Sequence, residues 1–267
     1  MILINGIQGS SIPVSDRGLM YGDGVFRTLV MQGGQPLWWE AHYNKLNADC
    51  VALKIMCPSQ AVLQQEIQQA GINEPDCVVK IVITRGQGAR GYLVDRAAQP
   101  TRIVSTYPLP CYPAGYCQAG VKVRLCDLRL AGQPLLAGIK HLNRLENVLA
   151  RMEWDDPDIA EGLLLDESGH VISGTMSNLV LVKEGALIVA DVGMCGVAGV
   201  TRQRIMAWAT AQKMPVSVQS VSLPLLMHAD EAMLCNSVIG VWQIIEFKYK
   251  KWATGNLTPK IRHALRD

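Results

Sequence analysis

One lysine stands in surroundings that suit covalent chemistry. Lys140 lies in the segment LLAGIKHLNRLENVL (135–149), where the preceding residues are apolar or small and a helix is predicted just after it. Such surroundings remove part of the hydration of an amine, which lowers its pKa and makes the neutral, nucleophilic form accessible. The alternative is a lysine whose amine reaches out to water. Spacing alone therefore does not identify a Schiff-base lysine.

Two further segments suit the binding of an anion. In GVAGVTRQR (196–204), a glycine-bearing turn leads into a predicted helix whose first residues include Thr201. Backbone N–H groups and the positive end of the helix dipole favour a phosphate at such a junction. In LCNSVIG (234–240), Asn236 and Ser237 follow an apolar strand and would add donors. The alternatives are a plain turn into a helix and an ordinary strand end.

A glycine-rich loop carries two arginines. In TRGQGARGY (84–92), Arg85 and Arg90 follow a strand that is predicted to be buried. Guanidinium groups grip carboxylates with two parallel hydrogen bonds, so this loop suits a carboxylate-bearing substrate. The alternative is a solvated hairpin loop. The segment SDRGLMYGDGVFRT (15–28), which contains Tyr21, predicts by itself only a sharp turn.

Composition excludes several classes of function. The 25 basic and 23 acidic residues give a net charge of +2 and are spread along the chain without a basic block, so nucleic acid is not an expected partner. The first residues lack a signal-peptide pattern, and no apolar run is long enough to span a bilayer. We therefore expect a soluble, cytoplasmic protein with no membrane partner.

The eight cysteines predict free thiols rather than a metal site. They show no CxxC pair and no histidine partner at metal-ligand spacing. Cysteine behaves as a small core hydrophobe when it is buried. No metal ligand is therefore expected in this chain.

Apolar periodicity predicts strands and helices in both halves of the chain. The opening residues predict two or three strands joined by tight turns. Helices are expected over 39–53, 61–70, 142–154 and 201–212, and strands over 78–84, 102–107, 121–130, 162–166, 178–183 and 186–189.

A stretch with two prolines and two glycines, LPCYPAGYCQAG (109–120), is the best linker. We therefore expect an N-terminal α/β domain over 1–110, a linker over 111–120, and a C-terminal α/β domain over 121–267 that carries Lys140. Strands interleaved with helices, with hairpins in each half, favour two α/β domains over one doubly wound sheet.

Taken together, the motifs resemble the fold-type IV pyridoxal-phosphate family, which includes branched-chain and D-amino acid aminotransferases and aminodeoxychorismate lyase. The resemblance lies in the order of the motifs along nearly the whole chain: SDRGLMYGDGVF, HYNKL, TRGQGARGY, AGIKHLNRLE, GTMSNL, GVAGVTRQ and LCNS. It implies a two-domain α/β (α+β) fold like that of D-amino acid aminotransferase, a homodimer, and pyridoxal 5'-phosphate as the cofactor.

Within the family, AGIKHLNRLENVL (137–149) and RGQGARGY (85–92) look most like the lyases. The resemblance implies a carbon–oxygen lyase of folate biosynthesis that converts 4-amino-4-deoxychorismate to 4-aminobenzoate and pyruvate, with Lys140 as the catalytic residue that forms the Schiff base. Residues implied near the cofactor are Lys45, Lys140, Ser173, Asn178, Gly199, Val200, Thr201, Asn236 and Ser237. Residues implied near the substrate are Tyr21, Arg85, Arg90, Tyr92 and Tyr107.

Three positions depart from the pattern of the family. Lys45 stands where the HxxRL segment usually has an arginine that binds phosphate. Lysine keeps the positive charge but lacks the forked guanidinium that makes two parallel hydrogen bonds. Ser173 stands where a glutamate usually pairs with the pyridine nitrogen. Serine cannot hold a proton there by charge, so the ring is a weaker electron sink, and we predict a slower or altered enzyme. Arg27 replaces a smaller or acidic residue, and the sequence alone offers no interpretation of it.

Two other functions fit the same resemblance. One is an aminotransferase for D- or branched-chain amino acids, with the same fold and cofactor. The other is a catalytically impaired relative, which the departures at Ser173 and Lys45 keep open.

Overall fold

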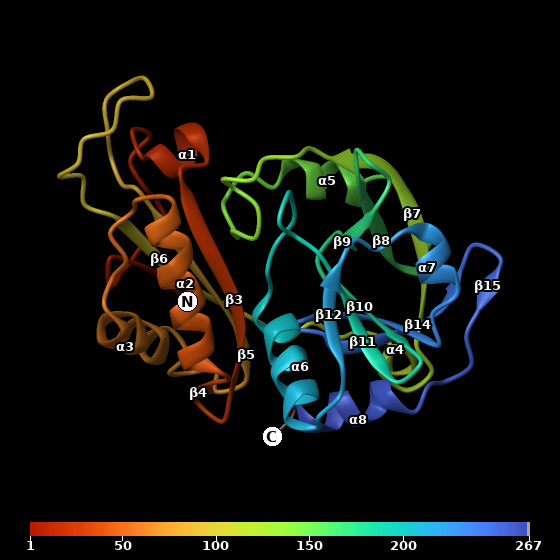
Figure 1. The fold of residues 1–267 in the computed structure, drawn as a ribbon. Helices are drawn as coiled ribbons and strands as arrows, with labels where there is room; N and C mark the ends of the chain where they lie inside the picture. Colours follow the sequence, from red (N-terminus) through yellow and green to blue (C-terminus); the bar gives the residue numbers. More distant parts are fainter. Residues whose placement is uncertain (266–267) are drawn as a thin grey trace. The chain divides into compact units, whose positions relative to one another are not determined.

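The computed structural model describes residues 1–265, whose contacts divide them into two compact units (Figure 1). The first unit contains residues 1–110 and 139–143. The second contains residues 111–138 and those from 144 onward. No helix within the described residues is long and apolar enough to cross a bilayer.

The first unit is a six-stranded sheet with two long helices on one face. Its strands run in the order β2-β1-β6-β5-β3-β4. The helix α2 packs on β3, and α3 packs on β1 and β6. The bounds are β1 (Ile2–Ile4), β2 (Ile7–Gln8), α1 (Arg17–Tyr21), β3 (Gly24–Gln32), β4 (Gln35–Pro36), α2 (Trp39–Ala52), α3 (Gln60–Ala70), β5 (Cys77–Thr84) and β6 (Thr101–Tyr107).

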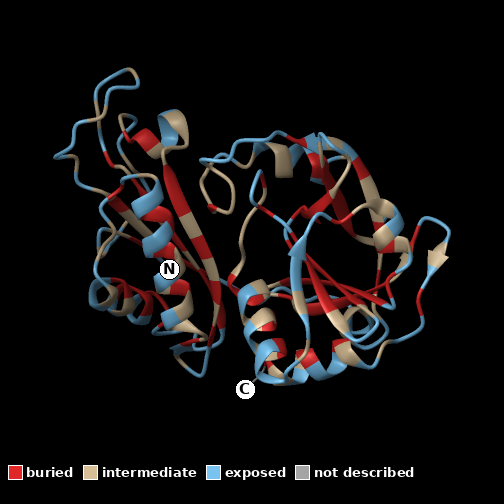
Figure 2. Ribbon diagram, in the orientation of Figure 1, coloured by how far each residue is buried: buried red, intermediate tan, exposed pale blue. Residues whose placement is uncertain are grey.

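Buried and partly buried residues alternate along most of β3, as expected for a strand with one face on a core, and Figure 2 shows this alternation. Val25, Leu29 and Met31 point to the helices and pack with Leu46 of α2 and Ile67 of α3. The sheet and its two helices therefore share one apolar core on one face of the sheet.

The second unit is built on a larger, curled sheet. Its strands follow the path β12-β11-β10-β13-β14-β7-β8-β9, and β9 also pairs with β10. The bounds are α4 (Ala114–Gln118), β7 (Val121–Leu130), α5 (Leu145–Arg151), β8 (Ile159–Asp166), β9 (Val171–Gly174), β10 (Asn178–Lys183), β11 (Ala186–Ala190), α6 (Val200–Ala211), β12 (Val216–Gln219), α7 (Leu223–Met227), β13 (Glu231–Asn236), β14 (Gly240–Phe247), β15 (Lys250–Lys251) and α8 (Leu257–Ala264).

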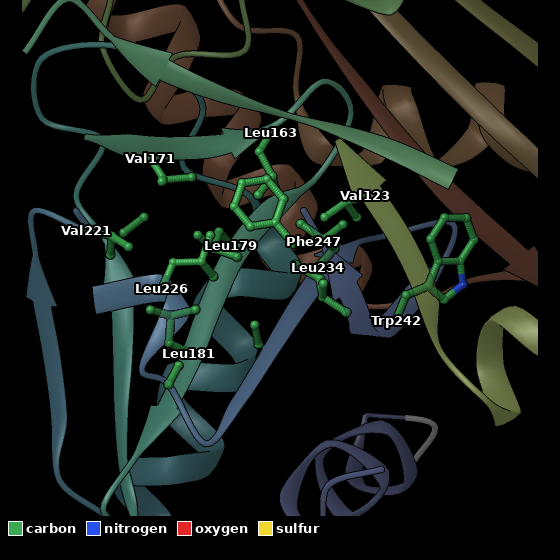
Figure 3. Packing of buried hydrophobic residues seen from close by; sticks show 14 of the residues in the cluster. Val123, Leu163, Val171, Leu179, Leu181, Val221, Leu226, Leu234, Trp242 and Phe247 are labelled. Carbon is green, nitrogen blue, oxygen red and sulfur yellow. The ribbon is translucent and has the colours of Figure 1, made fainter. Parts of the chain in front are cut away.

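The core of the second unit forms where side chains of this sheet meet one another, as Figure 3 shows. Leu179, Leu181 and Leu234 are buried on β10 and β13, and Trp242 and Phe247 are buried on β14. These strands read as nearly continuous apolar runs because almost every residue in them is buried.

Most of the predicted elements are confirmed, with boundaries that shift by a few residues: the helices α2, α3 and α6 and the strands β5, β6, β7, β8, β10 and β11. The helix predicted over 142–154 is shorter, since α5 begins only at Leu145. Leu142 instead donates its N–H to the carbonyl of Gly24 at 3.0 Å and so belongs to the edge of β3. The short helix α1 was not predicted.

The domain that carries Lys140 differs from the expectation. Residues 139–143 pack with the first unit, although they lie in the second half of the sequence. They do so because they extend the sheet beside β3, where Val25 pairs with His141. The expected linker also contains structure, namely the helix α4.

Candidate functional site

The backbone of Lys140 is held on both of its polar groups. Its carbonyl accepts the N–H of Phe26 on β3 at 2.9 Å, and its N–H donates to the carboxylate of Asp49 on α2 at 3.1 Å. The amine Nζ lies 4.3 Å from the centre of the Phe26 ring. A lysine whose main chain is fixed in this way presents its amine from a defined position, as a nucleophile requires.

A buried cluster of charges adjoins this segment. The carboxylate of Asp49 accepts hydrogen bonds from Nη2 of Arg27 and from Nζ of Lys45. Arg27 and Asp49 are both almost fully buried. Burial, and next the positive charge of Arg27, lowers the pKa of Lys45 to about 8. Burial lowers the pKa of Arg27 to about 10. Two cationic side chains thus share one carboxylate, and this arrangement suits an anion.

The second unit contains an anion cradle at the start of α6. Gly199, the residue before the helix, has no side chain that could cap the first turn, so it offers no acceptor to the N–H groups of Val200 and Thr201. The hydroxyl oxygens of Thr201 and Ser237 lie 3.3 Å apart. Backbone donors, two hydroxyls and the helix dipole therefore converge in a donor set that fits a phosphate.

Asn178 braces the turn that leads into α6. Its side-chain amide donates to the carbonyl of Val197 at 2.7 Å and accepts the N–H of Gly199 at 3.1 Å. A Cβ atom on Gly199 would lie 2.3 Å from the Asn178 oxygen, so only glycine fits beside it. Asn178, predicted as a cofactor contact, thus shapes the cradle through the backbone.

Ser173 is buried in the sheet next to Asn178. It lies on β9, where it is paired with Leu164 of β8 and with Asn178 of β10. A hydroxyl at this place can exchange a hydrogen bond with a ring nitrogen, but it carries no charge. The loss of electron-sink strength inferred from the sequence stays a prediction.

Sequence reasoning missed Glu161. This buried residue of β8 accepts hydrogen bonds from the backbone N–H groups of Gly162, Thr175 and Met176 and from the hydroxyls of Thr175 and Ser177. It therefore organises the turn 175–177 between β9 and β10. The only signal in the sequence was a lone glutamate inside an apolar strand.

Asn236 also acts on the backbone. Its amide donates to the carbonyl of Met176 at 3.0 Å, and its oxygen accepts the N–H groups of Val238 and Ile239. It thereby fixes the turn that carries Ser237. Asn178 and Asn236 thus shape the two turns that bring Thr201 and Ser237 together.

The guanidinium of Arg85 is used inside the first unit. It makes a bidentate ion pair with Asp23, at 2.7 and 2.9 Å, and donates to the carbonyls of Leu53 and Lys54 at 2.8 Å. The arginine predicted to grip a carboxylate thus has a carboxylate partner within the chain. A substrate role for Arg85 stays a prediction.

The rest of the predicted substrate loop is more open. The hydroxyl of Tyr21 accepts the N–H of Gly91 at 2.8 Å, and the rings of Tyr21 and Tyr92 lie 5.7 Å apart. Arg90 and Tyr92 are exposed. Tyr107 is also exposed, and its hydroxyl accepts a hydrogen bond from Ser105 at 3.3 Å. Tyr21 and Tyr92 are thus brought together, while Tyr107 lies at the end of β6.

The predicted residues fall into two groups, one in each unit. Lys45 and Lys140 meet on Asp49 in the first unit, and Ser173, Asn178, Asn236 and the cradle lie in the second. Pyridoxal phosphate requires a lysine amine and a set of donors for its phosphate, and the residue types present fit both requirements. Within residues 1–265, no group of side chains has the composition of a metal site.

Comparison with known proteins agrees with this chemistry. Residues 24–247 match the family model described as amino-transferase class IV. An aminodeoxychorismate lyase of Vibrio harveyi is 35% identical over 90% of this chain and 89% of its own length. A D-alanine aminotransferase of Listeria monocytogenes is 24% identical over 94% and 88% of the two chains.

Among solved structures, that of 4-amino-4-deoxychorismate lyase from Pseudomonas aeruginosa superposes with a TM-score of 0.96 at 43% identity, covering 100% of this chain and 98% of that one. The fold, the match to the family model and the share of the chain that the relatives cover all indicate the same family. The chain belongs to the class IV aminotransferase family.

Proposed function

We propose that this protein is a pyridoxal-phosphate-dependent lyase that converts 4-amino-4-deoxychorismate to 4-aminobenzoate and pyruvate. The observation that carries the proposal is the clamped backbone of Lys140, because it offers one defined amine to a cofactor. Support also comes from the relatives of Vibrio harveyi and Pseudomonas aeruginosa, which are lyases by name.

Each group of residues is assigned its own part in binding the cofactor. The N–H groups of Val200 and Thr201 and the hydroxyls of Thr201 and Ser237 would hold the phosphate. Lys45 would add a positive charge, and the hydroxyl of Ser173 would meet the ring nitrogen. Lys140 would hold the cofactor covalently until the substrate amine takes its place.

Lys140 then moves the proton in this scheme. Bound pyridoxal phosphate supplies an electron sink that stabilises negative charge on the amine-bearing carbon of the substrate. The released amine of Lys140 takes the proton from that carbon, because a neutral lysine amine can act as a nucleophile and then as a base. The C–O bond to the enolpyruvyl group then breaks, and enolpyruvate leaves with the electron pair of that bond and takes up a proton to become pyruvate. The product ring becomes aromatic, which drives the reaction forward.

The substrate loop supplies binding rather than bond-breaking groups. Arg90 is exposed and offers a guanidinium to a carboxylate of the substrate. Tyr21 and Tyr92 offer aromatic faces to its ring. Tyr107 would add a hydroxyl, and Arg85 would support the loop through Asp23.

We further propose that the protein is a cytoplasmic homodimer. Leu145 and Leu149 of α5 and Met152, which follows the helix, are exposed over 69%, 49% and 73% of their surface. Such an apolar face on a short helix suits burial against a second copy. All eight cysteines carry free thiols, as is usual in a reducing compartment. Light scattering at two protein concentrations would test the dimer, and a monomer in both would refute it.

The test of the reaction begins with trapping of the cofactor. Borohydride should join pyridoxal phosphate to the wild-type chain, seen as a mass increase, but not to Lys140→Ala. Lys80→Ala is a matched control, because the Lys80 amine lies 5.4 Å from the same Phe26 ring. Undiminished trapping in Lys140→Ala would refute the assignment.

The second part of the test distinguishes the two reactions. With 4-amino-4-deoxychorismate, the wild-type protein should release 4-aminobenzoate and pyruvate in equal amounts. The second candidate is an aminotransferase, favoured by the 24% identity to a D-alanine aminotransferase over most of the chain. Conversion of the bound cofactor to its amine form by D-alanine or leucine, without release of 4-aminobenzoate, would establish that alternative.

A further inference from the structure

Two charged residues of the first unit occupy positions that otherwise belong to the core. Arg27 lies on β3 on the same face as Val25 and Leu29, and it is only 2% exposed. Asp49 lies on α2 in the stripe of buried residues that includes Leu46, and it is 1% exposed. Arg27 extends from the apolar face of β3 and Asp49 from the facing side of α2, and the two side chains form an ion pair.

Stability alone does not account for this pair. A buried ion pair and a well-packed apolar pair of similar volume are often equally stable, since both ions must lose their hydration. Arg27 and Asp49 therefore need a further reason to occupy the core. The third partner of the carboxylate supplies it, because Oδ2 of Asp49 also accepts the N–H of Lys140 at 3.1 Å.

The hydrogen bonds of residues 140–142 support this reading. The carbonyl of Lys140 and the N–H of Leu142 bond to β3 as in an antiparallel pair. In a regular pair of this kind, the N–H of Lys140 would also donate to a carbonyl of β3. It donates instead to Asp49, so α2 as well as the sheet determines where Lys140 stands.

We propose that Asp49 is the positioning residue of Lys140. Its carboxylate accepts the Lys140 N–H and is itself fixed by ion pairs with Arg27 and Lys45. The proposal rests on the proposed role of Lys140 as the cofactor lysine. With both backbone groups held, only the side-chain torsions of Lys140 remain to be set, and the Phe26 ring lies beside its amine.

This arrangement also gives Arg27 a role. The Lys45 amine shares the Asp49 carboxylate, so without Arg27 this carboxylate would keep the partly buried Lys45 amine and the Lys140 N–H as partners. Arg27 holds the carboxylate from the sheet and balances its negative charge, so the positive charge of Lys45 stays available to an anion. Asp49 therefore affects both the charge at Lys45 and the position of Lys140.

The experiment compares Asp49→Ala and Asp49→Asn with a matched variant, Glu66→Gln. Glu66 is a buried carboxylate of the same unit whose ion-pair partner is Arg102 on β6. The first readout is hydrogen exchange at the Lys140 amide in cofactor-free protein. The second is the pH midpoint of the visible absorbance of protein loaded with pyridoxal phosphate.

In Asp49→Ala, the Lys140 amide should exchange about tenfold faster while β5 amides keep their wild-type rates. Asp49→Asn keeps an acceptor, so its amide should exchange more slowly than that of Asp49→Ala. Both variants lose the charge, and their spectral midpoints should move by about one pH unit. If Asp49→Ala does not fold, Asp49→Asn still reports through the midpoint.

Glu66→Gln should leave both readouts as in the wild type. The proposal is overturned if the amide and the midpoint are unchanged in the Asp49 variants, or if Glu66→Gln moves them equally. Failure of borohydride to trap the cofactor on Lys140 would instead refute the proposed function. The amide measurement does not depend on the cofactor, so the two failures are distinguishable.

Discussion

Replacing Glu161 by glutamine should loosen the second unit around β9 and β10. The carboxylate accepts five hydrogen bonds, three from backbone N–H groups and two from hydroxyls, in a buried place. Glutamine has the same shape but replaces one acceptor oxygen by an NH2 group. If that group takes the place of Oε2, it faces the N–H of Met176, and donor then meets donor.

The size of the effect follows from these bonds. One partly buried N–H loses its acceptor, and the remaining bonds lose the charge that strengthens them, so the free energy of unfolding should fall by about 3 kcal/mol. Thr175→Val removes only one hydroxyl bond and keeps the charge, and should lower it by about 1 kcal/mol. The turn 175–177 would loosen, and with it the positions of Ser173 and Asn178.

Urea denaturation followed by tryptophan fluorescence and circular dichroism measures both variants. Trp154 is a local reporter, because its ring packs beside Gly162. Retention of pyridoxal phosphate after dialysis measures the effect on the site, and it should fall in Glu161→Gln. The reasoning is refuted if Glu161→Gln is no less stable than Thr175→Val and retains the cofactor as the wild type does.

Three further changes test the site. The charge of Lys45 is lost as pH rises through its pKa of about 8, whereas the phosphate is already a dianion there. The dissociation constant of the cofactor should therefore rise in the wild type relative to that in Lys45→Arg, about tenfold by pH 9. A constant ratio of the two dissociation constants from pH 7 to 9 would contradict this. Gly199→Ala should weaken cofactor binding about tenfold, since its Cβ atom would displace Asn178, whereas Gly132→Ala, with open space at its Cβ, should not. Ser173→Glu should raise the rate if the electron sink is limiting, with Ser173→Gln as the uncharged control, and an unchanged or lower rate would reject that explanation.

Local patterns predicted many of the regular elements. Leu46 and Cys50 recur at helical spacing in α2, and β5 has a β-branched run; both elements form where expected. Val200, Thr201 and Ser237 were likewise predicted together, from the resemblance, and the structure brings the two hydroxyls within 3.3 Å.

The remaining features depend on contacts between residues far apart in the sequence. Arg27 and Asp49 each look misplaced in an apolar pattern, and only their pairing explains both. Lys140 was assigned to the C-terminal domain by its position in the chain, whereas its hydrogen bonds join it to the first sheet. Periodicity reports which face of an element is buried, and it does not report which distant partner covers that face.

The return of residues 139–143 to the first sheet also protects that sheet. β4 covers β3 only near Met31 and Gln32, so the stretch from Gly24 to Phe26 would otherwise present unpaired backbone groups. Exposed strand edges of this kind promote pairing between molecules and aggregation. A fragment that ends at residue 110 would contain every strand of the sheet and still leave this edge open. The segment that carries Lys140 therefore also helps to keep the protein from associating through this edge.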